Sequence, residues 1–290
     1  MKHIFILGIS LLFLFSCNNE NDSQPLKHIS RIKSFSKETG EFLNAHVVTY
    51  QPDFTVQSIK FEDHPFAPQY PSSQEIVNIN YNSGQHITEY TFGLKNGEGQ
   101  HYQEVYNFSV TDDKIIKYSD ITTGEIDNEH LFTNDINKPF VKKHFKDNQV
   151  FLIDFFEWTD GNITKISRYV PGEEALLDTE AFDQQIDSYR DKDPVNVISI
   201  QYDSNPKLAT HFEGMDFPQM IYNFDSYKTK NNPQLITNTT YASGIPTLLY
   251  TWEYKFNYDE DDYPLNAELS IKYASGLEDY ISYEYYYTEN

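Results

Sequence analysis

The stretch "TWEYKFNYDEDDYPLNAELSIKY", residues 251–273, decides the fold class. It contains two consecutive runs in which apolar or aromatic residues alternate with mostly polar ones. Aromatic residues occupy every second position from Trp252 to Tyr258, and apolar residues every second position from Leu265 to Tyr273. A period of two is that of a β-strand whose two faces meet different surroundings. The connection between the two runs is short, and "DYISYEYYY" (279–287) follows as a third run, so we expect an antiparallel meander.

The same signature extends outward over the rest of the chain. Strand-like runs alternate with turns, and Asn96-Gly97 supplies the strongest short hairpin signal. The first run places Ile29, Ile32 and Phe35 at spacing three, which also allows a helix, but its β-branched residues favour a strand. We therefore predict a single all-β domain over 28–290. It would be an antiparallel meander of about ten to fourteen strands, curling into a half-barrel or barrel-like sheet.

The sheet has one structural rival and two expected interruptions. A transmembrane barrel is the structural rival, although charged residues within most strands favour a form that does not span the membrane. One helical insertion is expected near 173–190, where Phe182, Ile186 and Tyr189 fall at i, i+4 and i+7. A second irregular region is expected over 204–233, which is rich in proline.

The N-terminus predicts a location. A charged start and about a dozen apolar residues describe a signal peptide over 1–16, too short for a membrane-spanning helix. Leu14-Phe15-Ser16-Cys17 resembles a bacterial lipobox, in which the cysteine becomes the acylated first residue. An ordinary signal peptide with a stray cysteine is the alternative. On the lipoprotein interpretation, Cys17 carries acyl chains such as palmitate, and residues 17–27 form a flexible tether to the membrane.

That interpretation places the domain in the bacterial cell envelope, lipid-anchored at the outer membrane. Acidic residues soon after the cysteine, Glu20 and Asp22, are compatible with display at the cell surface. The formal net charge of −22 repels nucleic acid and leaves cationic or neutral ligands, such as glycans, as partners.

No catalytic, cofactor or metal motif emerges from the sequence. The acidic run Asp259–Asp262 lacks the spacing of a calcium loop and is better explained as a hairpin turn. His86 and His101 lie on runs expected to pair, so a cross-strand site is conceivable, but solvent-facing histidines are more common. Two tryptophans, Trp158 and Trp252, are candidates for stacking on a sugar, with ordinary sheet packing as the simpler explanation.

Four short elements in the C-terminal half resemble a Bacteroidetes lipoprotein family of unknown function with a porin-like fold. They are Tyr202-Asp203, Asn205-Pro206, Asn231-Asn232-Pro233 and the turn from Tyr258 to Pro264. The usual glycine of that last turn is replaced by Asp262. The resemblance implies a large, curved antiparallel sheet and no established activity.

Three functional hypotheses follow from these observations, the third being a purely structural role in an envelope complex. The first is an envelope lipoprotein that binds or scaffolds without catalysis, with a glycan or an outer-membrane protein as its partner. The second is a hydrolase that uses a pair of acidic residues, which the 44 carboxylates of the chain neither favour nor exclude.

Overall fold

The computed structural model describes residues 27–53, 55–63, 73–83, 86–95, 101–132, 138–172, 186–205 and 229–289. These residues form sixteen strands and one 3₁₀ helix. In chain order they are β1 (Lys27–Ser36), β2 (Phe42–Tyr50), β3 (Val56–Asp63), β4 (Ser73–Tyr81), β5 (Ile87–Lys95), β6 (His101–Val110), β7 (Lys114–Asp120), β8 (Glu125–Phe132), β9 (Pro139–Lys146), β10 (Gln149–Thr159), β11 (Asn162–Tyr169), η2 (Ile186–Asp191), β12 (Asn196–Tyr202), β13 (Pro233–Ala242), β14 (Ile245–Tyr258), β15 (Pro264–Tyr273) and β16 (Glu278–Glu289).

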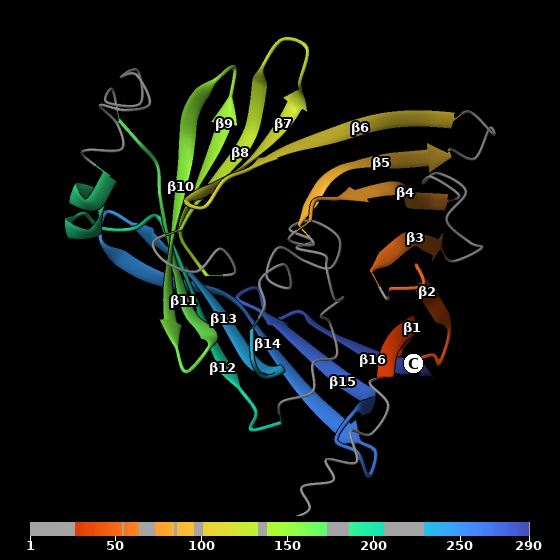
Figure 1. The fold of residues 1–290 in the computed structure, drawn as a ribbon. Coiled ribbons are helices and arrows are strands. Elements are labelled where there is room, and N and C mark those ends of the chain that lie inside the picture. Colours follow the sequence, from red (N-terminus) through yellow and green to blue (C-terminus); the bar gives the residue numbers. More distant parts are fainter. Residues whose placement is uncertain are drawn as a thin grey trace, which may run out of the picture.

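The strands form one closed antiparallel barrel (Figure 1). Each strand pairs with its neighbours in sequence, and β1 closes the barrel by pairing with β16 from Lys27↔Glu289 to Ser36↔Ile281. The all-β, barrel-like prediction is confirmed, but the predicted ten to fourteen strands were too few. In the described part of the chain, no helix is long and apolar enough to cross a membrane.

The helix η2 identifies which face of the wall points outward. It lies beyond the outer side of β10 and β11 (Figure 1), where the Arg190 guanidinium is 4.4 Å from the Phe155 ring centroid. Phe155 therefore faces out, and its neighbours Asp154 and Phe156 face the interior, because successive side chains on a strand point to opposite faces. Residues that are paired across neighbouring strands point to the same face of the wall. Starting from Phe156, the register therefore shows which residues of β11 to β16 face the interior.

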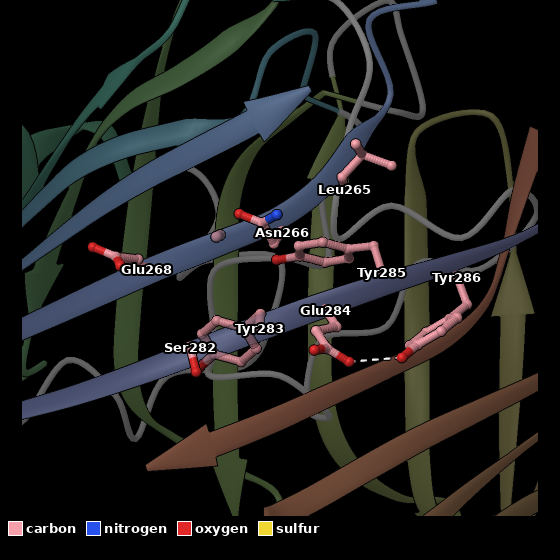
Figure 2. Close-up of a pocket in the computed structure, with 9 residues that line it drawn as sticks. Leu265, Asn266, Glu268, Ser282, Tyr283, Glu284, Tyr285 and Tyr286 are labelled. Atoms are coloured by element: carbon pink, nitrogen blue, oxygen red, sulfur yellow. Dashed lines mark hydrogen bonds between the residues drawn. The ribbon is translucent and has the colours of Figure 1, made fainter. Parts of the chain in front are cut away.

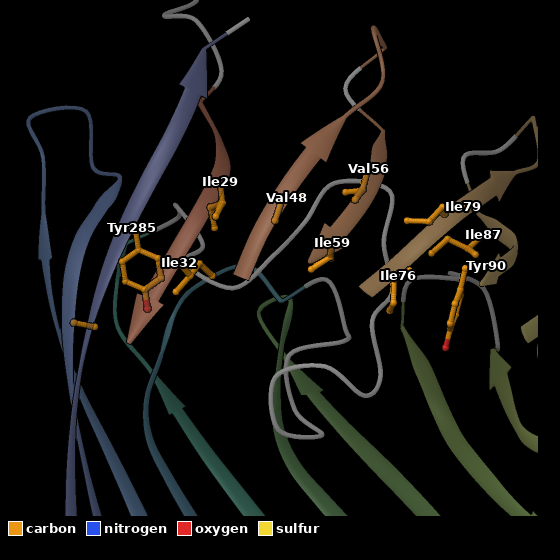
Figure 3. Close-up of a cluster of buried hydrophobic side chains, with 11 residues drawn as sticks. Ile29, Ile32, Val48, Val56, Ile59, Ile76, Ile79, Ile87, Tyr90 and Tyr285 are labelled. Carbon is orange, nitrogen blue, oxygen red and sulfur yellow. The ribbon is translucent and has the colours of Figure 1, made fainter. Parts of the chain in front are cut away.

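Most of the inner wall is apolar. One buried cluster runs over β15, β16 and β1–β5 (Figure 3), and a second over β10–β15. The inward side chains of Ile59, Ile76 and Ile236 are only 1% exposed. A third cluster, on the outer face of β9–β11, is covered by Ile186 and Tyr189 of η2.

The outer wall carries charges in solvent. Ion pairs join Lys255 to Glu253 and Lys165 to Glu157, all with side chains at least 41% exposed. The polar set that alternates with Trp252 in the opening stretch lies on this face.

A bulge explains the unusual spacing in the first strand. In β1 the pairing with β16 shifts between Ile29 and Arg31, so that the extra residue restores both Ile29 and Ile32 to the inner face. A spacing of three here is thus a strand with a bulge. The expected strand is confirmed, and the helical alternative was wrong.

Aromatic side chains fasten one end of the barrel. Even-numbered strands end there, and in five of them an aromatic residue at or near the end donates a hydrogen bond to a carbonyl near the start of the preceding strand. The pairs are Tyr50 to Ile29 (2.6 Å), Tyr81 to Val56 (2.9 Å), Trp158 to Pro139 (2.9 Å), Tyr202 to Ile163 (2.8 Å) and Tyr287 to Pro264 (2.6 Å). We call this the aromatic end. Each such bond contributes about 1 kcal/mol and fixes the hairpin's stagger.

Two local predictions meet the structure only in part. Residues 173–185 of the expected helix lie outside the described residues, whereas 186–191 form η2. The β5–β6 hairpin is confirmed by the pair Lys95↔His101, although Asn96-Gly97 lies outside the described residues. His86 precedes β5, so it lies at the opposite end of that hairpin from His101. The suggested cross-strand histidine site was therefore wrong.

Candidate functional site

A sector of the inner wall is polar, in contrast to the two apolar clusters beside it. Strand register brings His130 of β8, Lys142 of β9, Asp154 of β10 and Arg168 of β11 into one row across the wall. A second row contains Lys117 of β7, Asn128 of β8 and His144 of β9. We call the set Lys117, His130, Lys142, His144, Asp154 and Arg168 the inner basic cluster.

Asp154 lies at the centre of the cluster. Its oxygens accept hydrogen bonds from Arg168 Nε (2.7 Å) and Nη2 (2.9 Å), and one of them lies 3.0 Å from His144 Nε2. Burial alone would raise the pKa of Asp154, but the bonds from Arg168 and His144 outweigh burial and hold that pKa well below its usual range. Asp154 is therefore ionised at neutral pH.

Lys117 forms the second ion pair of the cluster. Its ammonium is 2.9 Å from the carboxylate of Asp127 and 4.1 Å from the ring centroid of Tyr106. The ring and the carboxylate together satisfy a cation whose side chain is only 3% exposed. Lys117 and Arg168 thus each have a carboxylate partner.

Lys142 differs from both. The residue is 9% exposed, and within the described residues its ammonium makes no hydrogen bond or ion pair. Burial lowers the pKa of Lys142 to about 8, the neighbouring Asp154 opposes that effect, and Lys117 adds to it. At pH 7 most Lys142 side chains are still protonated. Each then carries a largely buried positive charge that lies opposite Asp154 in the strand register and makes no ion pair within the described residues.

The two histidines of the cluster, His130 and His144, do not change its charge at neutral pH. Burial lowers the pKa of His144, and burial together with the nearby Lys142 lowers the pKa of His130 well below its usual range. Both rings are neutral at pH 7. Among the described residues, Arg168 is paired with Asp154 and Lys117 with Asp127, so Lys142 is the cation of the cluster that has no carboxylate of its own. A further carboxylate, Glu104, accepts a hydrogen bond from the Tyr106 hydroxyl at the edge of the cluster.

Comparisons with known proteins give a fold likeness only. No family model matches the chain, and no curated protein matches it. Among solved structures, a porin-like protein from Bacteroides uniformis is similar over 90% of this chain and 96% of its own, with TM-score 0.40 and 9% identity. One from Bacteroides vulgatus is similar over 91% and 99%, with TM-score 0.39 and 12% identity.

The residues proposed from sequence are placed away from the cluster. Cys17 lies outside the described residues. Trp252 is 8% exposed on the inner wall, stacked on Tyr250 with ring centroids 5.1 Å apart, and Trp158 is half-buried at the aromatic end. Sugar stacking by these two residues stays a prediction.

The elements that carry the family resemblance converge at the aromatic end. Asn232 donates from its backbone N–H to Asp203 (3.2 Å) and from its side chain to the Tyr258 hydroxyl (3.1 Å), which in turn donates to Asp203. Asn231 donates to the Asn205 carbonyl (2.8 Å). These residues therefore fasten the two ends of the 204–232 connection, so their role is structural.

The acidic run 259–262 is a hairpin turn between β14 and β15. Asp259 accepts backbone hydrogen bonds from Asp261 (3.0 Å) and Tyr263 (2.8 Å). The Lys27 ammonium lies 2.8 Å from the carboxylates of both Asp259 and Asp261, and these bonds raise the pKa of Lys27. The turn thus holds the start of β1.

A hollow of about 460 Å³ lies over β15 and β16 (Figure 2). Its two carboxylates already have partners: Glu268 is paired with Lys37, and Glu284 accepts from the Tyr286 hydroxyl at 2.6 Å. The hollow is therefore a polar surface depression with no unpartnered acid pair in view.

Sequence reasoning missed the inner basic cluster. One signal was present: Asp154 interrupts the apolar run "FLIDFFEW", and "VKKHFK" places consecutive cations inside a strand. A charge in a run that is otherwise apolar indicates a strand covered on both faces, with a partner on a neighbouring strand.

Proposed function

We propose that the chain is a lipid-anchored, non-catalytic binding protein of the bacterial cell envelope and that the inner wall of its barrel is the binding surface. The observation that supports this most is the difference between the two walls. The outer wall carries ion pairs in solvent, except over β8–β11, where it is covered. The inner wall combines two apolar clusters with Lys142, a largely buried ammonium that makes no ion pair within the described residues. Buried charge without a partner costs stability, and proteins retain such features mainly at sites of function.

The anchor limits how far the barrel can lie from the membrane under this proposal. An acylated Cys17 precedes Lys27, the first residue of β1, by ten positions, and an extended chain of that length spans about 35 Å. Lys27 is held at the aromatic end by the turn 259–263. The start of β1 at the aromatic end would therefore lie within about 35 Å of the membrane.

The anchor is tested by labelling cells with an alkyne analogue of palmitate. We expect label on the wild-type protein and none on Cys17→Ala, and a labelled Cys17→Ala protein would contradict the anchor. The binding role is tested with the purified protein on a panel of polysaccharides and envelope proteins. We expect retention without turnover, and cleavage of any polysaccharide would contradict it.

Hydrolysis by an acid pair is the second candidate. The hollow on β15 and β16 is the described place where two glutamates line one depression, Glu268 and Glu284. A hydrolase would lose its activity in both Glu268→Gln and Glu284→Gln. The existing partners of these carboxylates make this the weaker proposal.

A further inference from the structure

The inner basic cluster has the composition of a ligand site that is lacking one anion. Two of its three cations have carboxylate partners, and the third, Lys142, has none among the described residues. An incoming group with one negative charge would balance the charge of Lys142.

The surroundings of Lys142 determine what must be attached to that anion. On one side, Lys117 sits over the ring of Tyr106, which belongs to the first apolar cluster together with Tyr90 and Phe108. On the other, Asp154 and Arg168 adjoin Phe156 of the second apolar cluster. A ligand whose charge reaches Lys142 therefore places the rest of its surface against aromatic and aliphatic side chains.

We propose that the inner basic cluster binds a small amphiphile, a carboxylate on an apolar body, with Lys142 as the group that pairs with the carboxylate. Arg168 and Lys117, each fixed by its own carboxylate, would hold the positive field around it. The apolar clusters would cover the body of the ligand. This inference rests on the proposed binding role of the inner wall and specifies its ligand class.

Several features agree with this assignment. The cluster retains a positive charge although the whole chain carries −22, so its sign does not merely follow the composition. Burial lowers the pKa of Lys142 to about 8, and a bound anion would raise it again, so ligand binding would be coupled to proton uptake. Binding should then weaken as the pH is raised beyond about 8.

The test is calorimetric titration of the full lipoprotein, held in lipid nanodiscs, with hexanoate at pH 7. Hexanamide, a neutral molecule of the same shape, and glucuronate, a carboxylate on a polar body, are the comparison ligands. Lys142→Met removes the charge and keeps the aliphatic stem, and Lys142→Arg keeps the charge. Lys146→Met, the same change at an exposed position of β9, is the matched control.

We expect one hexanoate per wild-type chain, with unchanged affinity in Lys146→Met and at least tenfold weaker affinity in Lys142→Met. Lys142→Arg should retain most of the affinity, and hexanamide and glucuronate should each bind at least tenfold more weakly than hexanoate. If Lys142→Met does not fold, the loss of wild-type affinity between pH 7 and pH 10 serves as the test of the charge.

Three results would overturn the inference: no hexanoate binding by the wild type, equal binding by Lys142→Met, or equal binding of hexanamide. Preferential binding of glucuronate would overturn the apolar part of the assignment and return the ligand to the glycan class. These outcomes are separate from those that test the proposed function. A chain that is acylated and cleaves nothing, yet ignores hexanoate, refutes only this inference.

Discussion

Replacing Asp154 with asparagine removes the charge that balances Arg168 on the inner wall. Asp154 is 5% exposed in its side chain and Arg168 is 31% exposed, so the guanidinium keeps some access to water. Breaking a buried ion pair by removing one partner costs about 3–5 kcal/mol. Because Arg168 is partly exposed, we expect the lower end of that range, a loss of about 3 kcal/mol in the free energy of unfolding.

Urea unfolding followed by tryptophan fluorescence measures this loss from the shift in midpoint and the slope. The matched control is Asp187→Asn on η2, where the side chain is 83% exposed and its pair with Arg190 spans 3.4 Å. An exposed pair of that kind is worth about 0–1 kcal/mol, so the control should stay close to wild type. A loss below about 1 kcal/mol in Asp154→Asn would refute the reasoning that the pair is buried and balanced.

The difference in unfolding free energy between wild type and Asp154→Asn should depend on pH if its origin is electrostatic. The pKa of Asp154 is lowered in the folded protein, so the carboxylate's stabilisation is fully present above its unfolded pKa, about 3.9. It is lost as the pH falls below that value toward the folded pKa. The difference in unfolding free energy between wild type and Asp154→Asn should therefore be constant from pH 5 to 7 and decrease below about pH 4. A difference that does not decrease would point to a packing effect of the asparagine instead.

Three further predictions use the same unfolding assay. Tyr202→Phe removes the hydrogen bond to the Ile163 carbonyl and should cost about 1 kcal/mol, while Tyr286→Phe on the exposed outer wall should cost less than half of that. Asp262 adopts φ +66°, where glycine has no steric penalty, so Asp262→Gly should stabilise the protein by up to about 1 kcal/mol; a loss would show that its side chain matters. Lys142→Met should raise the free energy of unfolding by about 1–3 kcal/mol at pH 7, because the lowered pKa of Lys142 means that its protonated form destabilises the folded state below about pH 8. This gain should vanish above about pH 10, where the lysine is neutral in the folded state.

The sequence predicted the elements with a clear period and missed those without one. The alternation from Trp252 to Tyr258 is visible because that strand has an apolar inner face and a polar outer face. In β8 and β9 both faces are covered, and Glu129, Lys142 and Lys143 are all buried there. The alternation is therefore lost, which explains why the strand count came out too low.

The inner basic cluster was out of reach for a different reason. Its members come from β7, β8, β9, β10 and β11, and only the strand register brings them together. Single charges such as Arg168 give no hint in the sequence of which partner they will meet. By contrast, Asp262 could be assigned a turn position from sequence, and its positive φ explains why glycine is the usual residue there.

The pairing of β1 with β16 determines when this barrel can be completed. Every other strand pair joins segments that are consecutive along the chain, so those hairpins can form as soon as their residues are available. The last seam joins Lys27 to Glu289, and closing a loop of that length carries the largest entropic cost of any pairing in the molecule. Until β16 is available to pair with β1, the first and last strands present unpaired backbone edges. A chain that lacked its last strand would therefore keep these two edges exposed to pairing with other chains.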